Sequence, residues 1–156
     1  MSSNYYNTPL YAESISSVTA TPSVLTGAHR TEAGDEYRYV YNDGNSQIGP
    51  GYGCIISAVS GYSVTISSTT NSNGFFGIVK HATLTTGTYG WVMVRGFAPI
   101  KAPANSGIAA GAILSIGGDG VVTDCPVTGV AAAPQGYCVV ATASAGVGLG
   151  YVKLFG

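Results

Sequence analysis

The sequence predicts an all-β protein, built as a small β-barrel or β-sandwich with an extended N-terminal arm. Val and Ile together occupy 26 of the 156 positions against 6 for Leu, and β-branched side chains favour strands over helices. Gly and Pro occupy another 30 positions at short intervals, so the strands must be short and the turns many. In the last third, strand-like runs recur every 8 to 15 residues, a spacing typical of sandwiches and barrels. A chain of this length matches one domain.

The arm is expected over residues 1–28, followed by a single β domain over residues 29–156. Residues 1–28 hold one charge, Glu13, and show no period of 2 or 3.6. Three tyrosines, Tyr5, Tyr6 and Tyr11, fall within eleven positions, and aromatic side chains are enriched at protein interfaces. A tail without fixed structure is the alternative, because chain ends are often disordered unless something ties them down.

The first predicted strand covers residues 37–41. Its alternation places Tyr37, Tyr39 and Tyr41 on one face. Arg38 and Val40 share the other, so neither face is cleanly apolar. This strand is therefore expected at a sheet edge or a subunit contact, with a turn after it at residues 42–45.

The remaining strands are predicted from short apolar runs between turn residues. Residues 54–59 and 62–67 form a hairpin with its turn at 60–61. Loops are expected at residues 102–111 and 126–135, with one short helical turn near 130–133. Further strands are predicted at residues 75–79, 89–95, 97–101, 112–116, 120–123, 136–142 and 149–155.

Charge is scarce: 8% of residues are charged and the net charge is −1, about a third of the usual charged share. A polar but nearly uncharged exterior favours packing against neighbours. The six basic residues are dispersed, which argues against a nucleic-acid partner. No run of about 18 apolar residues predicts a membrane span. The first residues do not resemble a secretory signal, so synthesis and retention in the cytoplasm are expected.

No histidine-based catalytic site is predicted. His29 and His81 are 52 positions apart and are interpreted as ordinary surface or interface residues. Members of a Ser-His-Asp triad need not be close in sequence. However, the nearest string to a nucleophile elbow, residues 61–65, lacks the second Gly and falls within a strand.

The acidic residues give no stronger indication of catalysis. Glu32, Asp35 and Glu36 lie between Arg30 and Arg38, a pattern that favours a solvated, salt-bridged turn over a pair of catalytic carboxylates. Two sets of side-chain oxygens could be considered for calcium, but neither reaches the ligand number of a recognisable loop. These are Asn42, Asp43 and Asn45 in one set, and Asp119 and Asp124 in the other.

Neither the cysteines nor the glycine-rich strings indicate a binding site. Cys54, Cys125 and Cys138 are an odd number with no C-x-x-C spacing, so neither a disulfide framework nor a zinc site is expected. The strings at residues 117–120 and 146–150 join strands, whereas a phosphate loop must open a helix. We interpret them as turns or bulges. The sequence therefore predicts no enzyme activity, no metal and no cofactor.

One long segment resembles the capsid decoration, or cement, proteins of tailed bacteriophages. Residues 87–100 read GTYGWVMVRGFAPI, residues 108–112 read IAAGA, and residues 118–123 read GDGVVT. A GYCVV strand at 136–140 and a closing GYVKLF strand at 150–155 follow. The upstream segment DEYRYV at residues 35–40 matches the acidic turn and aromatic strand of that family, while residues 54–67 depart from its pattern.

The resemblance implies a structural virion protein without catalytic residues. Such a protein sits on the outer surface of the phage head, usually as a homotrimer, and stabilises the lattice of the major capsid protein. On this hypothesis the arm reaches the capsid through Tyr5, Tyr6 and Tyr11, and deleting residues 1–25 should abolish head binding but leave a folded domain.

The alternative is a carbohydrate-binding or receptor-binding module of a viral fibre. Exposed Tyr and Trp rings can stack on sugar rings, and Tyr89 with Trp91 could form such a platform. Against this, Trp91 lies in the most apolar strand of the sequence, where burial is expected.

Overall fold

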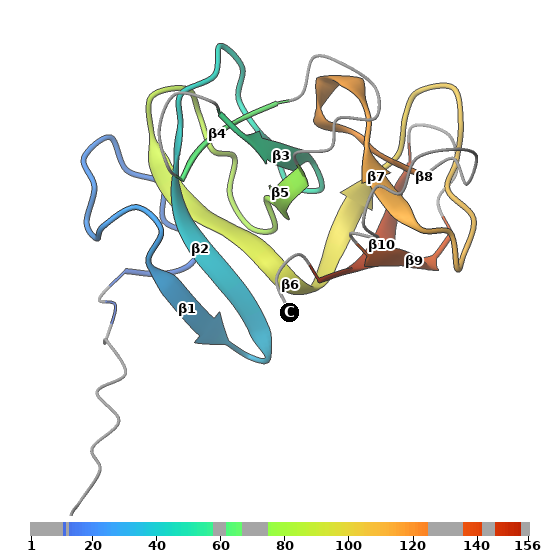
Figure 1. Ribbon diagram of the computed structural model, residues 1–156, viewed down its shortest axis with the longest axis horizontal. Coiled ribbons are helices and arrows are strands. Elements are labelled where there is room, and N and C mark those ends of the chain that lie inside the picture. The colour runs from blue at the N-terminus through green and yellow to red at the C-terminus, as the bar shows by residue number, and fades with distance from the viewer. Residues whose placement is uncertain are drawn as a thin grey trace, which may run out of the picture.

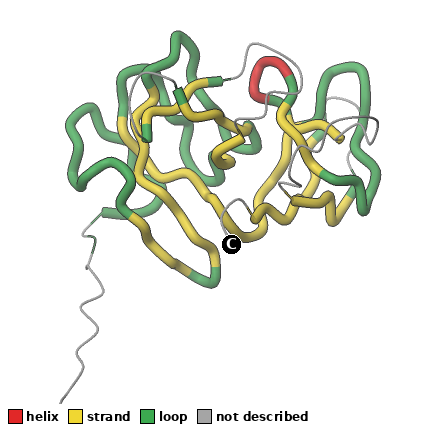
Figure 2. The backbone as a smooth tube through the Cα atoms, viewed as in Figure 1, coloured by secondary structure: helices red, strands yellow, loops and turns green. Residues whose placement is uncertain are grey.

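The computed structural model describes residue 11 and residues 13–57, 62–66, 75–124, 136–141 and 146–153. In these residues it is an all-β structure with one short 3-10 segment at Gly118–Gly120, as Figure 2 shows, so the predicted fold class is confirmed. No helix in this part of the chain is long and apolar enough to span a membrane. The strands are β1 (His29–Glu32), β2 (Asp35–Asn42), β3 (Gly53–Ile56), β4 (Ser63–Thr65), β5 (Phe75–Ile78), β6 (Tyr89–Lys101), β7 (Leu114–Ile116), β8 (Val122–Asp124), β9 (Gly136–Val140) and β10 (Val147–Lys153).

Five of the strands close into a barrel, which decides between the two predicted architectures. The hydrogen-bonded order β2-β4-β3-β5-β6 returns to its start because β6 also pairs with β2. All neighbours in the ring are antiparallel except β2 and β4. Closure removes the free edges that an open sheet of these strands would expose. In Figure 1 the barrel forms the left half of the molecule.

The barrel is filled by one side of each of its strands. Alternate residues point inward because successive side chains of a strand lie on opposite faces. Asn42 is also fully buried, and its amide donates to the carbonyls of Ser46 and Leu84 at 2.9 and 3.0 Å. The apolar side chains of this inner cluster are Val40, Ile48, Cys54, Val64, Phe76, Val79, Leu84, Val92 and Val94.

Strand β6 links the barrel to a second lobe. Its first half pairs with β2 and its second half with β10, which in turn pairs with β9. The change occurs around Gly96, whose φ of +130° is a conformation that favours glycine. In Figure 1, β6 runs from the barrel into the right half, where the hairpin of β7 and β8 lies against the sheet of β6, β10 and β9.

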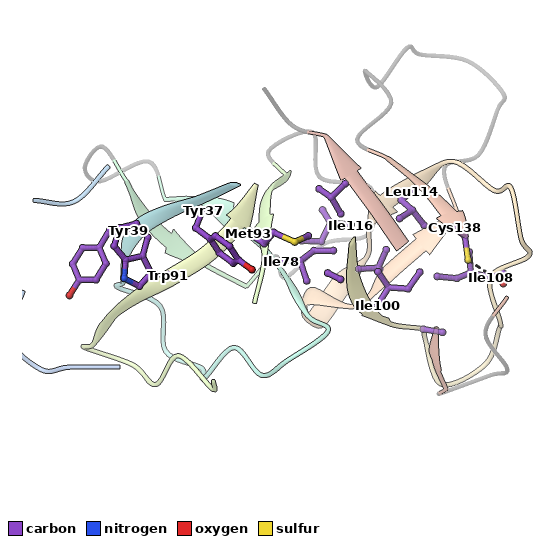
Figure 3. Close-up of a cluster of buried hydrophobic side chains, with 14 residues drawn as sticks. Tyr37, Tyr39, Ile78, Trp91, Met93, Ile100, Ile108, Leu114, Ile116 and Cys138 are labelled. Carbon is purple, nitrogen blue, oxygen red and sulfur yellow. Dashed lines mark hydrogen bonds between the residues drawn. The ribbon is translucent and has the colours of Figure 1, made fainter. Parts of the chain in front are cut away.

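A second, outer cluster of buried side chains joins the two lobes. It begins at Tyr39 and Trp91 on the outside of the barrel, continues through Met93 and ends at Ile108 and Cys138, as Figure 3 shows. On β6, odd-numbered residues join this cluster before Gly96, and Ala98 and Ile100 join it afterwards. Where β6 passes Glu36 and Tyr37 of β2, it has one extra residue, which forms a bulge. The bulge and the bend at Gly96 together change which side of β6 faces the outer cluster.

The prediction that residues 37–41 form an edge strand is wrong. In the structure β2 has β6 on one side and β1 followed by β4 on the other. Arg38 can occupy an interior strand because its guanidinium donates to the carbonyl of Gly27 at 2.9 Å. Strand β1 was not predicted, because its residues HRTE include Arg30 and Glu32 and no apolar side chain. Its turn, with Ala33 at φ 52° and Gly34 at φ 87°, has the two positive φ values of a tight hairpin.

The other predictions agree more closely with the structure. The hairpin at residues 54–67 is confirmed by the pairing of β3 with β4. The separate strands predicted at 89–95 and 97–101 are instead one strand of 13 residues, because Gly96 bends the chain without ending the sheet. The turn at 60–61, the helical turn near 130–133, and Cys125 lie outside the described residues.

Candidate functional site

The charged residues gather at the β1–β2 hairpin. Four ion pairs are found among the described residues, and each involves this hairpin: His29 with Glu36, Arg30 with Glu32, Lys80 with Asp35, and Arg95 with Glu36. Each of the three acidic residues therefore has its own cation, as expected for a salt-bridged turn. The described residues contain no group of three His, Cys, Asp or Glu side chains that could hold a metal ion.

Asp35 connects the hairpin to the bend of β6. Its carboxylate accepts hydrogen bonds from the Tyr37 hydroxyl at 3.3 Å and from the backbone N–H of Phe97 at 3.3 Å, and it pairs with Lys80. Gly96 lies so close to this carboxylate that a Cβ at position 96 would overlap it. Asp35 thus holds three segments together, which is a structural role.

His81 lies beside this group. Its Nε2 is 3.2 Å from the Tyr37 hydroxyl, which donates to Asp35 and can therefore accept from an Nε2–H. His81 is exposed on one side, but partial desolvation lowers its pKa, and the positive charge of Lys80 lowers it further, outweighing the nearby carboxylates of Asp35 and Glu32. Neutral His81 fits this position as a hydrogen-bond donor.

The two described cysteines are buried. Cys54 lies inside the barrel with its thiol 3.5 Å from the Gly77 carbonyl, and burial raises its pKa to about 12. Cys138 is 1% exposed, and burial also raises the pKa of its thiol. Thiols with raised pKa values are poor nucleophiles at neutral pH, which fits the interpretation that both residues act as small apolar side chains.

Tyr11 packs against the barrel. Its hydroxyl donates to the His29 carbonyl at 2.9 Å, and its ring meets Trp91 edge to face with the ring centroids 5.0 Å apart. The Arg30 guanidinium lies 5.8 Å from the centroids of both rings. Of the three tyrosines predicted to bind a capsid, Tyr11 is therefore already engaged within the chain, and Tyr5 and Tyr6 lie outside the described residues.

The segment after Tyr11 continues along the outside of the barrel. Thr19 pairs with Tyr89 through two backbone hydrogen bonds of 3.0 and 2.8 Å. The hydroxyl of Ser23 lies 3.1 Å from that of Tyr39. Residues 13–28 thus help to cover Tyr39 and Trp91, so the proposed deletion of residues 1–25 would uncover part of the outer cluster.

The predicted sugar-stacking platform is not available on Trp91. The indole is only 5% exposed and lies between Tyr11 and Tyr39. An open pocket of about 500 Å³ lies elsewhere, between residues 103–106 and the β7–β8 hairpin. Its lining includes Ser106, Asp119 and Thr123, which supply two hydroxyls and a carboxylate.

The second lobe exposes an apolar surface that sequence reasoning missed. On β10, Gly150 and Val152 point to the core, so Val147, Leu149 and Tyr151 lie on the opposite side. Phe97 and Val140 join them from the neighbouring strands, since Phe97 is opposite Tyr151 and Val140 is opposite Leu149. We call these five side chains the outer apolar face. The alternation GVGLGY of residues 146–151 could have indicated it, because Gly occupies every inward position.

The exposure of this face is substantial. The exposed fractions are 61% for Val147, 54% for Val140, 47% for Phe97 and 36% for Leu149. Phe97 and Tyr151 contact each other edge to face with centroids 5.0 Å apart. A contiguous apolar area of this kind is the usual mark of an interaction site on a folded protein.

Comparison with known proteins shows a similarity at the level of structure. No protein-family model matches the chain, and no curated protein matches it in sequence. Among solved structures, it is similar to the head fiber gp8.5 N base of bacteriophage phi29, with a TM-score of 0.53 and 16% sequence identity. The similarity covers 75% of this chain and 94% of that chain. At this level of identity, it shows that the two chains share a fold.

Proposed function

We propose that this chain is a structural protein of a bacteriophage virion. It binds the outer surface of the head and stabilises the lattice of the major capsid protein, without enzymatic activity of its own. The observation that carries the proposal is the fold shared with a phage head fiber base over nearly the whole of that chain. The resemblance of residues 35–40 and 87–155 to capsid decoration proteins supports it independently.

The physical character of the chain supports the same role. A protein that binds an assembled shell but not its separated subunits stabilises the shell by mass action. This requires surface area and no chemistry. Low charge and the outer apolar face suit such contacts. As part of this proposal, the chain associates with itself as a homotrimer.

The N-terminal residues supply the capsid contact in this proposal. Tyr11 anchors the base of the arm on Trp91 and the His29 carbonyl. Tyr5 and Tyr6 precede that anchor by six and five positions and provide the aromatic contacts to the capsid. A truncation that tests this must therefore end before Tyr11 and leave the outer cluster covered.

The test is co-sedimentation with empty heads of the phage whose genome encodes this chain. The full chain should saturate the heads and raise the temperature at which they disassemble. A variant with residues 2–10 replaced by a Gly/Ser segment of equal length should bind at least tenfold more weakly. Its thermal unfolding should match that of the full chain. No binding by the full chain would reject the proposed function, and unchanged binding by the variant would reject the role of the arm.

A second candidate is a carbohydrate-binding or receptor-binding module of a viral fibre. The phi29 protein is part of a head fiber, which favours this candidate, as does the pocket with Ser106, Asp119 and Thr123. Hydroxyl and carboxylate groups are suited to hydrogen bonds with sugar hydroxyls. Binding on a glycan array that is lost in Asp119→Ala, without binding to heads, would favour this candidate.

A further inference from the structure

We infer that the outer apolar face is where one copy of this chain packs against a second copy. The face consists of Phe97, Val140, Val147, Leu149 and Tyr151 on the sheet of β6, β10 and β9. In Figure 1 this sheet lies along the lower margin of the right half, with β7 and β8 on its other side. The inference deepens the proposed self-association, on which it rests, by assigning it a surface.

The size of the face fits an interface between folded chains. From the exposed fractions of its side chains, the face presents roughly 400 Å² of surface, near the level at which patches on monomers mark contact sites. A standard interface buries about 800 Å² per partner, of which somewhat more than half is apolar. The outer apolar face therefore supplies most of the apolar part of one such interface. A single exposed side chain such as Leu25 is too small to supply such an area.

The distribution of charge favours a second copy as the occupant. None of the five side chains of the face is charged, and the four ion pairs of the described residues all lie at the β1–β2 hairpin. A partner that is recognised through its charge would require side chains of the opposite charge on this face. Copies that meet through this face around the axis of the proposed homotrimer bring no like charges together at the centre of the contact, and the net charge of −1 adds little repulsion between whole chains.

Charged residues lie at both ends of the outer apolar face and limit its extent. Lys101 lies opposite Val147 at one end of the sheet, and Arg95, paired with Glu36, lies at the other end. Charged groups at the rim with apolar side chains at the centre are the usual arrangement of protein interfaces. The bulge at β9 also exposes Val139 beside the face.

The experiment is sedimentation velocity of the purified full chain over a hundredfold concentration range. The wild type should show a concentration-dependent species larger than the 15.8 kDa monomer. Val147→Lys and Val140→Lys place a charge on two different strands of the face. Both should raise the dissociation constant at least tenfold, because each would bury an unpaired charge in the contact. Leu25→Lys is the matched control, since Leu25 is 87% exposed and outside the face. It should behave as the wild type.

Three other outcomes would overturn the inference. A wild type that remains a 15.8 kDa monomer at every concentration would reject it. So would an oligomer that both lysine variants retain, with circular dichroism confirming that they are folded. A monomeric wild type whose head binding is lost in Val147→Lys would assign the face to the capsid. The proposed function can fail separately, because a wild type that associates through this face without binding heads supports the interface alone.

Discussion

At the scale of single residues, polar groups in this protein are placed to join segments. Asp35 receives hydrogen bonds from Tyr37 and from the backbone of Phe97 and pairs with Lys80. Asn42 makes two donor contacts inside the barrel. Because a buried polar group without partners costs about 1–3 kcal/mol, such residues specify one arrangement of the chain around them.

His81 predicts a pH dependence of stability. Its pKa is lowered in the folded protein by burial and by Lys80, so the unfolded chain binds the proton more readily. The free energy of unfolding should therefore fall as the pH drops below the unfolded value near 6.5. Gln at this position can still donate to Tyr37 but cannot be protonated. Urea unfolding of the wild type and His81→Gln at pH 7.5 and 5.5 should show the variant gaining stability relative to the wild type at the lower pH.

A constant difference between the two proteins at both pH values would contradict this expectation.

At the scale of elements, β6 determines the shape of the molecule. It belongs to the barrel through β2 and β5 and to the second lobe through β10. Its bend at Gly96 is stabilised by Asp35, which accepts from the next backbone N–H. The two lobes are thereby built on one continuous strand, and the outer cluster runs across the bend.

Gly96→Ala should be severely destabilising. Alanine would adopt φ +130° with strain, and its Cβ would overlap the Asp35 carboxylate. The loss is expected to be at least about 3 kcal/mol in the free energy of unfolding. Gly34→Ala is the matched control, because Gly34 also has positive φ but has nothing within 4 Å of the added carbon. It should lose about 1 kcal/mol. Equal losses in guanidinium unfolding would show that the contact with Asp35 is unimportant.

At the scale of the whole molecule, charge and apolar surface are separated. The ion pairs gather at the β1–β2 hairpin, and the outer apolar face lies on the second lobe, with Arg95 and Lys101 only at its two ends. This separation divides the surface into a solvated region and a region suited to a protein partner. With few charges overall, long-range electrostatic steering is weak.

Self-association should therefore be insensitive to salt. Ions screen contacts between exposed charges over about 10 Å at 0.1 M salt but do not weaken apolar contacts. Raising NaCl from 0.1 to 0.5 M should change the dissociation constant by less than about threefold, as measured by sedimentation equilibrium. A loss of association at the higher salt would instead identify an ion-paired contact. Weaker association of Glu36→Gln would then assign that contact to the β1–β2 hairpin.

Local patterns were sufficient for much of the fold. A short segment has its own preference for strand or turn, and it retains this preference in any sheet. Such preferences are seen in the alternation of residues 37–41, in the apolar runs of 54–59 and 75–79, and in the turn glycines. For the candidate site they were less informative. The contact of Tyr11 with Trp91 could not be predicted from a local pattern, because Trp91 lies 80 positions away in the chain.

The sequence by itself determined that the chain is all-β, with short strands and little charge, because these properties follow from residue types and spacing. Only the tertiary structure decided that five strands close into a barrel, that β1 exists despite its charges, and that β2 lies inside the sheet. It also decided that Val147, Leu149 and Phe97 meet on one exposed face. The physical reason is that strand pairing joins residues far apart in the chain. Which face of a strand is covered therefore depends on its partners and not on its own pattern.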